Sequence, residues 1–192
     1  MNRLNKTLWS FGLLLLLAAC GSVPPAPTDH FYRLQAVSVA PPPTKPIATV
    51  AVNAFGADSL YAERPIIYSE EASLRELGQY HYHLWLYPPG QLVSEHFRAS
   101  LNKALEITSD VQAPNAIDGR IVNFERVLSG RSSKAVVALE LSLKSGGKML
   151  LHRIYRAEQP TSDDSLGAFA VAMEQALGTI YMEFLADVAR SR

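Results

Sequence analysis

Cys20 is the one cysteine in this chain of 192 residues. Disulfides within the chain, CxxC redox motifs and thiolate metal sites are therefore excluded. A domain without such cross-links depends on an apolar core for its stability. The composition can supply one, because 48% of the residues are hydrophobic and 19% are charged, as is typical of globular domains. We therefore expect one core-forming domain of ordinary size.

A basic start and an apolar run at residues 8–17 precede Cys20. The run is shorter than the roughly 20 residues that a membrane-spanning helix needs, and small residues follow it, so the pattern predicts a cleaved secretory signal peptide. The end of this signal, Leu17-Ala18-Ala19-Cys20, closely resembles the bacterial lipobox, in which the cut precedes a cysteine that is lipidated. We expect cleavage between Ala19 and Cys20 and a lipid on Cys20. The alternative is an ordinary secretory signal with an incidental cysteine.

Three parts are expected along the chain. Residues 1–19 form the lipoprotein signal peptide, and residues 20–29 form the lipidated N-terminus and a proline-rich tether. Three prolines between Ser22 and Thr28 favour extended polyproline geometry over a packed fold. Residues 30–192 then form a single periplasmic α+β domain.

The charge balance argues against nucleic acid as a partner. The chain has 18 basic and 18 acidic residues, and the signal peptide contains Arg3 and Lys6 but no acid, so the remainder has 16 basic and 18 acidic residues. No run of Lys or Arg occurs, whereas nucleic-acid binding needs a basic patch or stripe. We expect no nucleic-acid partner, and a homo-oligomer is compatible with the sequence.

Short strands are predicted in the N-terminal half. Ile47–Val52 is rich in β-branched residues with apolar positions at period two, as expected for a central strand, and His30–Leu34 has a strand's composition. Glu63–Ser69 is entered through a proline, which indicates an edge strand or the first residue of a strand. Leu77-Gly78 interrupts the pattern, and the aromatic segment Gln79–Tyr87 is predicted as a further strand.

From Gln91 onward the apolar period becomes that of a helix. Proline suits the first turn of a helix, so we expect Pro89 to lie in that turn. Ile107–Pro114 is predicted as a connector with one short strand. The apolar positions at helical spacing are Leu92, Val93, Phe97, Leu101 and Leu105.

An antiparallel meander is predicted over Ile117–Ser129, Ala135–Lys144 and Met149–Arg156. Turns are expected at Ser129-Gly130 and Gly146-Gly147, because glycine adopts the positive φ angles of two-residue hairpin turns. Alternation in the middle strand predicts one packed and one wetter face of the sheet. The packed set is Val137, Leu139, Leu141 and Leu143, and the wetter set is Val136, Ala138, Glu140 and Ser142.

A long amphipathic helix is predicted at the C-terminal end, where it should cover one face of the sheet. Thr161 with Asp164 three residues later resembles a capping box. The predicted fold class is α+β: one mixed, largely antiparallel sheet with two main helices packed on it, in a single domain. The apolar positions of the last helix are Leu166, Phe169, Ala170, Met173, Leu177, Ile180, Tyr181, Phe184 and Val188.

Local sequence supports neither a catalytic nor a metal site. His81 and His83 would face the same side of a strand, but no third ligand stands at a recognisable metal spacing. A nucleophile elbow, a P-loop, a dinucleotide fingerprint and an HExxH motif are all absent from the sequence. We therefore expect no enzymatic activity, no metal and no cofactor apart from the covalent lipid.

The aromatic stretch Tyr80–Tyr87 allows two interpretations. In the first, alternate residues from Tyr80 to Leu86 pack under a helix while His81, His83 and Trp85 face outward. In the second, the outward Trp85 and Tyr87, beside Pro88-Pro89, offer an apolar platform to a partner protein or to lipid.

Several short motifs occur in a recognisable order. Arg64-Pro65-Ile66-Ile67-Tyr68 is followed by Tyr80-x-Tyr82-x-Leu84-Trp85, by Pro88-Pro89 and by an amphipathic helix, and His30-Phe31-Tyr32-Arg33-Leu34 follows the lipobox. In this order and spacing the chain resembles the ABC-type transport auxiliary lipoproteins over nearly all of its mature length.

The resemblance implies a non-enzymatic lipoprotein at the periplasmic face of the outer membrane. Such a protein works with an ABC permease and ATPase and with a periplasmic MCE-domain protein that conducts lipid between the membranes. Gly21 after the cysteine agrees with the family's outer-membrane sorting. The alternatives are a lipoprotein that carries lipid in its own cavity and a structural or assembly lipoprotein unrelated to ABC transport. The candidate partner-binding residues are Arg64, Tyr68, Trp85, Tyr87, Pro88 and Pro89.

Overall fold

The computed structural model of the protein describes residues 26–40, 47–110 and 112–191. The predicted signal peptide, its cleavage site at Ala19 and Cys20, and the first part of the tether lie outside the described residues. Lipidation of Cys20 therefore stays a prediction from the sequence.

The described residues form one mixed β-sheet with two α-helices packed on it, so the predicted α+β class is confirmed. The helices are α2 (Pro89–Leu101), α3 (Leu166–Arg190) and a short 3-10 helix, η1 (Ser59–Ala62). The strands are β1 (His30–Tyr32), β2 (Val50–Val52), β3 (Gly56–Ala57), β4 (Pro65–Glu70), β5 (Ser73–Trp85), β6 (Ile107–Thr108), β7 (Asn115–Ser129), β8 (Ser132–Ser145) and β9 (Lys148–Pro160).

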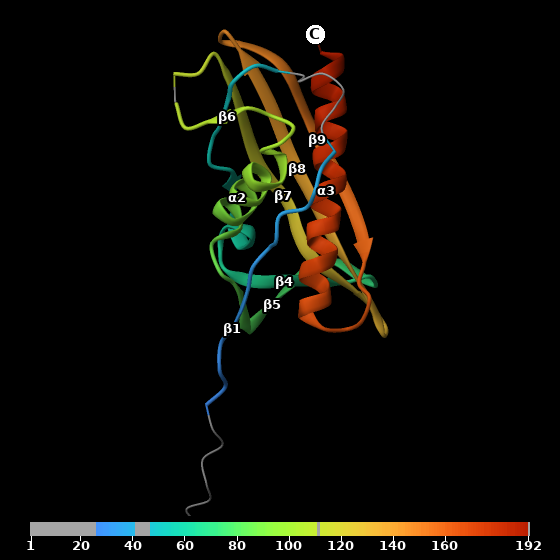
Figure 1. The fold of residues 1–192 in the computed structure, drawn as a ribbon. Coiled ribbons are helices and arrows are strands. Elements are labelled where there is room, and N and C mark those ends of the chain that lie inside the picture. The colour runs from blue at the N-terminus through green and yellow to red at the C-terminus, as the bar shows by residue number, and fades with distance from the viewer. Residues whose placement is uncertain (1–25, 41–46, 111, 192) are drawn as a thin grey trace, which may run out of the picture.

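Strand β7 is the centre of the sheet. Along one edge it pairs antiparallel with β8, which in turn pairs with β9, so the predicted meander is confirmed. Along its other edge it pairs in parallel with β2, β3 and β4 in succession. Strand β5 is antiparallel to β4, and β1 is parallel to β5. Two sets of strands, one local in sequence and one assembled from distant segments, thus meet at β7 (Figure 1).

The second hairpin of the meander has the predicted turn. Gly146 and Gly147 connect β8 to β9 and have φ angles of +54° and +79°. Both angles lie in the left-handed region that glycine adopts without a steric penalty, as a type I′ hairpin turn requires. The turn therefore fixes the register in which β9 returns along β8.

Both helices lie on the same face of the sheet, with α3 running along β8 and β9 and α2 beside it (Figure 1). Pro89, which was predicted in the first turn, is the first residue of α2, and the helix ends at Leu101. All nine predicted apolar positions of α3 are buried, which confirms the core-facing stripe. Within the described ranges, neither helix combines the length and the apolarity that crossing a bilayer requires.

The predicted capping box of α3 is wrong. The N-cap is Ser165, whose Oγ accepts a hydrogen bond from the backbone N–H of Ala168 at 3.0 Å. Thr161 instead donates its hydroxyl to the carbonyl of Ser133 at 3.0 Å. Asp164 is paired with Arg126. Tertiary partners thus engage both residues of the motif, and the next serine takes the cap.

The predicted wetter face of β8 is only partly correct. Val136 and Ala138 are as buried as the residues of the packed face. The register places Val136 between Glu125 of β7 and Glu158 of β9, and the aliphatic stems of such long side chains cover apolar surface. Tyr61 from η1 also reaches this face, where its hydroxyl donates to Glu125 at 3.1 Å.

Candidate functional site

The structure does not bring the six predicted partner-binding residues onto one exposed surface. Two belong to β4 or directly precede it, one ends β5, and three lie in or beside the turn into α2. Tyr87 and Pro88 are exposed in this turn, whereas Pro89 is buried as the first residue of α2. In chain order the six are Arg64, Tyr68, Trp85, Tyr87, Pro88 and Pro89.

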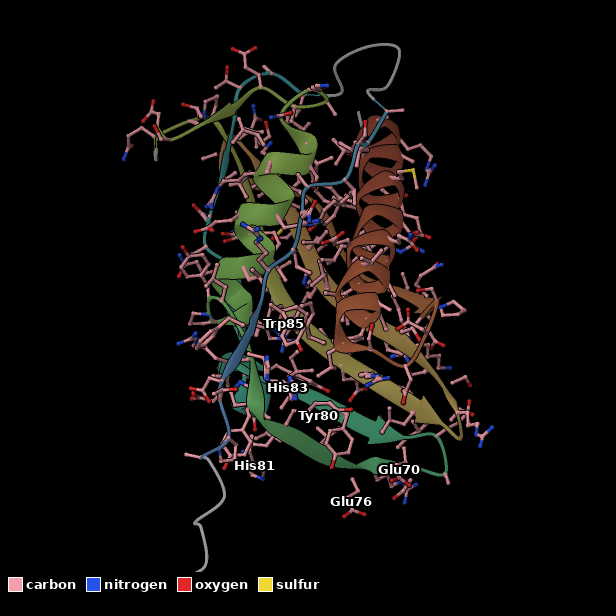
Figure 2. All side chains as sticks on the ribbon, turned by 60° about the horizontal axis from the view of Figure 1, so that its bottom comes forward. Glu70, Glu76, Tyr80, His81, His83 and Trp85 are labelled. Atoms are coloured by element: carbon pink, nitrogen blue, oxygen red, sulfur yellow. The ribbon has the colours of Figure 1, made fainter. Side chains whose placement is uncertain are left out.

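Trp85 belongs to the core, and its predicted outward orientation is wrong. The side chain is 1% exposed. Its ring lies 5.2 Å from that of Phe124 and 5.8 Å from that of Phe169, measured between centroids. Figure 2 shows Trp85 in the space between the sheet and the helices. It therefore stabilises the domain and cannot belong to a binding surface.

An irregular register between β4 and β5 explains the error. Pro65 pairs with Leu84 but Ile67 pairs with Gln79, so two steps along β4 correspond to five along β5. An odd number of steps exchanges the two faces of a strand. Trp85 consequently points to the helices, on the same side as Tyr80.

The predicted interruption of the chain at Leu77-Gly78 is also wrong, because β5 continues through it from Ser73. Gly78 pairs with Tyr68 of β4, and a Cβ at Gly78 would overlap the Tyr68 ring. The glycine therefore allows a tyrosine to lie flat across the neighbouring strand. This is a close approach within the strand, not a break in it.

The outer face of β1 and β5 carries exposed apolar side chains. Leu84 pairs with Phe31 of β1, and Tyr82 lies two residues before it in β5. Leu86 lies two residues after Leu84, just beyond the end of β5, and its N–H still donates to the carbonyl of Tyr32 in β1 at 2.7 Å. Phe31 is 52% exposed, Tyr82 45% and Leu86 40%. Side chains two residues apart share a face of a strand, so these four form one surface. We call Phe31, Tyr82, Leu84 and Leu86 the outer aromatic surface.

Arg64 adds a positive charge to the outer aromatic surface. Its Nε donates a hydrogen bond to the carbonyl of Trp85 at 3.0 Å, and its guanidinium lies over the Phe31 ring at 5.1 Å from the centroid. This is a cation–π arrangement. The surface therefore offers apolar area with an adjacent cation, which suits binding. Sequence reasoning identified Arg64 but missed Phe31, because nothing local indicates that β1 pairs with β5.

The helix-facing side of the same strands holds a cluster of polar aromatic residues. The hydroxyl of Tyr32 lies 3.0 Å from Nδ1 of His83, and His83 stacks on His30 with 5.0 Å between centroids. Tyr80 meets His83 edge to face at 5.8 Å and lies 4.8 Å from Tyr68. Burial raises the pKa of the Tyr32 hydroxyl.

Arg126 of β7 anchors this cluster to α3. Its side chain is 4% exposed. Nε donates to Ser133 at 2.9 Å, Nη1 donates to Tyr80 at 3.2 Å, and Nη2 donates to the carbonyl of Asp164 at 2.9 Å and pairs with the Asp164 carboxylate. A buried arginine requires such a full set of acceptors. Sequence reasoning missed it, because a single basic residue in a strand carries no local signal.

The two histidines weighed as metal ligands have different environments. His83 is half-buried against His30 and Tyr32, and His81 is exposed. Among the residues that the structure describes, no three His, Cys, Asp or Glu side chains are grouped as a metal site requires.

Comparison with known proteins identifies the fold. No model of a protein family matches the chain, and no curated protein matches it. A crystal structure of a protein from Xanthomonas campestris, assigned to the family DUF330, matches with a TM-score of 0.71 and 18% identity, over 84% of this chain and 96% of that one. A crystal structure of an uncharacterized protein matches with a TM-score of 0.65 and 16% identity, over 85% and 98%. The α+β fold is therefore shared with solved proteins along nearly their whole length.

Proposed function

We propose that this chain is a lipoprotein held at the periplasmic face of the outer membrane through a lipid on Cys20. The observation that carries the proposal is Leu17-Ala18-Ala19-Cys20, a lipobox at the end of a short signal sequence. One acyl chain binds a membrane only marginally, whereas two or more anchor a protein stably, at about 0.8 kcal/mol for each buried CH₂ group. A lipidated cysteine of the bacterial kind carries two or more acyl chains and would therefore anchor the protein stably.

In this proposal the domain is a non-catalytic auxiliary component of an ABC- and MCE-type system that moves lipid between the two membranes. The order of the motifs from His30 to Pro89, which resembles the auxiliary lipoproteins, supports this role. In this role the domain contributes a binding surface, because packed rings close its core.

Lipid carriage within the domain has less support. The space between sheet and helices is filled by aromatic side chains: Phe97 of α2 lies 4.9 Å from Tyr181 and 5.9 Å from Phe184 of α3, between ring centroids. These rings are fully buried. A lipid chain would have to displace them, so the auxiliary role is the better supported of the two.

The anchor is tested by Cys20→Ala. We expect the variant to lose palmitate labelling and to accumulate as an unprocessed precursor or in the soluble periplasm, since the thiol that receives the lipid is missing. Ser22→Ala, two residues beyond the lipobox cysteine, is the matched control and should behave as the wild type. Retained labelling and outer-membrane fractionation of Cys20→Ala would contradict the anchor.

The auxiliary role is tested by purification of the tagged wild-type protein from cross-linked membranes, followed by mass spectrometry. A periplasmic MCE-domain protein or an ABC permease is expected among the partners, and both should persist in the Ser22→Ala control. Recovery of phospholipid alone, stoichiometric with the protein, would instead favour the carrier.

A further inference from the structure

The outer aromatic surface is an exposed apolar area that the fold itself leaves uncovered. Five of the twelve exposed large hydrophobic side chains of the described residues lie in β5 or the two residues after it, and a sixth, Phe31, lies in the neighbouring β1. By contrast, Met182 is exposed in the C-terminal half of α3, where the nearest exposed large hydrophobic side chain in the helix is Val171. Half of these side chains thus belong to β1, β5 and the two residues after β5, and a smaller group, Met149, Leu150 and Ile154, lies in β9.

The course of the chain indicates what could cover this surface. Residues 26–29 lead into β1 at the end of the molecule opposite to the C-terminus of α3 (Figure 1). Phe31 is eleven residues after Cys20, and at 3.3–3.6 Å per residue a fully extended segment spans at most about 40 Å. A lipid on Cys20 therefore keeps the outer aromatic surface within that distance of the bilayer, whatever path the segment takes.

The chemistry of the surface matches the headgroup region of a membrane. Tyrosine and other amphipathic rings concentrate at that level, with an apolar body and a polar tip. Phe31 and Leu86 provide apolar area, Tyr82 provides a ring with a hydroxyl, and Arg64 holds a guanidinium over Phe31 at 5.1 Å. A cation beside apolar side chains suits a layer of anionic phosphates above acyl chains.

We propose that the outer aromatic surface rests on the lipid headgroups of the bilayer that holds Cys20, so that the domain lies against the membrane on its β1–β5 side. The inference builds on the proposed lipid anchor and adds an orientation to it. In this orientation the C-terminal end of α3 and the turn between β8 and β9 point away from the lipid and into the periplasm. A periplasmic partner would then meet the domain at that end.

The orientation is tested with spin labels on the lipidated, full-length processed protein, reconstituted in vesicles of phosphatidylethanolamine and phosphatidylglycerol. Lipidation occupies the sulfur of Cys20, so an introduced cysteine is the one free thiol. Tyr82→Cys places the label on the surface, and Met182→Cys, 53% exposed on α3, is the matched control. Equal thermal unfolding midpoints of the two variants show that both are folded.

We expect the label at position 82 to collide with a water-soluble nickel chelate at most about one third as often as the label at position 182, because interfacial burial excludes the chelate. It should collide with oxygen more often than the label at position 182 does. Equal accessibility at both positions would overturn the proposal. So would dipolar broadening at position 82 that disappears on dilution with unlabelled protein, because it would show a second copy on this surface. Shielding in native membranes but not in vesicles would assign the surface to a protein partner.

Failure of the anchor is distinguished by vesicle flotation. Protein that does not float with the vesicles overturns both the anchor and the orientation. Protein that floats while position 82 stays accessible to the chelate overturns the orientation alone.

Discussion

Strand β5 presents aromatic rings on both of its faces, in opposite environments. Trp85 is 1% exposed and packs on Phe124 and Phe169, whereas Tyr82, three residues earlier, is 45% exposed beside Phe31. The rings on one face hold the sheet to the helices, and those on the other are available for binding. The comparison teaches that stability and binding are divided within one strand by the direction of each side chain.

The largest expected effect tests the packed face. Trp85→Ala should lower the free energy of unfolding by about 3–5 kcal/mol, the usual cost of removing a large ring from a close-packed core. Tyr82→Ala, the matched change on the outer face, should cost no more than about 0.5 kcal/mol. Urea unfolding followed by circular dichroism measures both. Similar losses for the two variants would remove the distinction between the faces.

A second effect concerns a buried histidine of α2 that contacts α3. Nε2 of His96 lies 2.9 Å from the carbonyl of Gln35, which can only accept, so the neutral ring carries its hydrogen on Nε2. Nδ1 therefore accepts from the Tyr181 hydroxyl at 2.9 Å. Burial lowers the pKa of His96 to about 4, from an ordinary value of 6.5. Protonation would turn both ring nitrogens into hydrogen-bond donors and would place a positive charge in a buried site, away from water.

Stability should therefore depend on pH through His96. The unfolded chain takes up the proton first as the pH falls, so this contribution is complete above pH 6.5 and declines from there to about pH 4, by up to about 3 kcal/mol. Glu125, which is buried, and Glu174, which is half-buried, have raised pKa values, so the measurement compares wild type with His96→Gln. Urea unfolding at pH 7 and pH 4.5 should show a smaller loss in the variant. Identical losses would contradict a buried neutral imidazole.

A third effect tests the charged link between β7 and α3. Asp164→Ala leaves the Arg126 guanidinium, 4% exposed, without its carboxylate, and we expect a loss of about 2 kcal/mol. Asp58→Ala is the control, because Asp58 pairs with Arg120 where both side chains are exposed and such pairs contribute about 1 kcal/mol or less. Chemical denaturation of both variants gives the comparison. The prediction is wrong if the two losses are equal.

The smallest effect tests the start of α3. Ser165→Ala removes the hydroxyl that accepts from the Ala168 N–H and should cost about 1 kcal/mol, as is usual for an N-cap. Ser162→Ala, three residues before the cap and outside the helix, should leave the unfolding midpoint unchanged. A larger loss of stability for Ser162→Ala than for Ser165→Ala would contradict Ser165 as the N-cap and indicate that the helix begins earlier.

Much of the fold could be predicted because its signals are local. Period-two apolar residues and Gly146-Gly147 predict the meander. Apolar residues three and four apart predict α3. Each signal reports on neighbours within a few residues, and hairpins and helices are built from such neighbours. The Thr161–Asp164 motif failed for the opposite reason, since partners 28 and 38 residues away engage its two ends.

The candidate site could be predicted only in part. Arg64 was identified, but Trp85 was placed on the wrong face, and Phe31 was not recognised as part of the surface. Each of these errors involves the pairing of β5 with β1 or β4. The number of extra residues in a strand decides which face each later side chain takes, and alternation counted along β5 alone does not contain that number.

By itself the sequence determined that this chain has one cysteine, a stretch ending in it that resembles a lipobox, a core without disulfides and an α+β order of elements, because composition, motifs and short periods depend on consecutive residues. Tertiary structure alone decided that Trp85 faces the helices, that Arg126 binds the start of α3, and that Phe31, Tyr82, Leu84 and Leu86 share one exposed surface. These facts depend on the register between strands far apart in the chain, where packing against a partner selects one alignment from several that the local pattern allows.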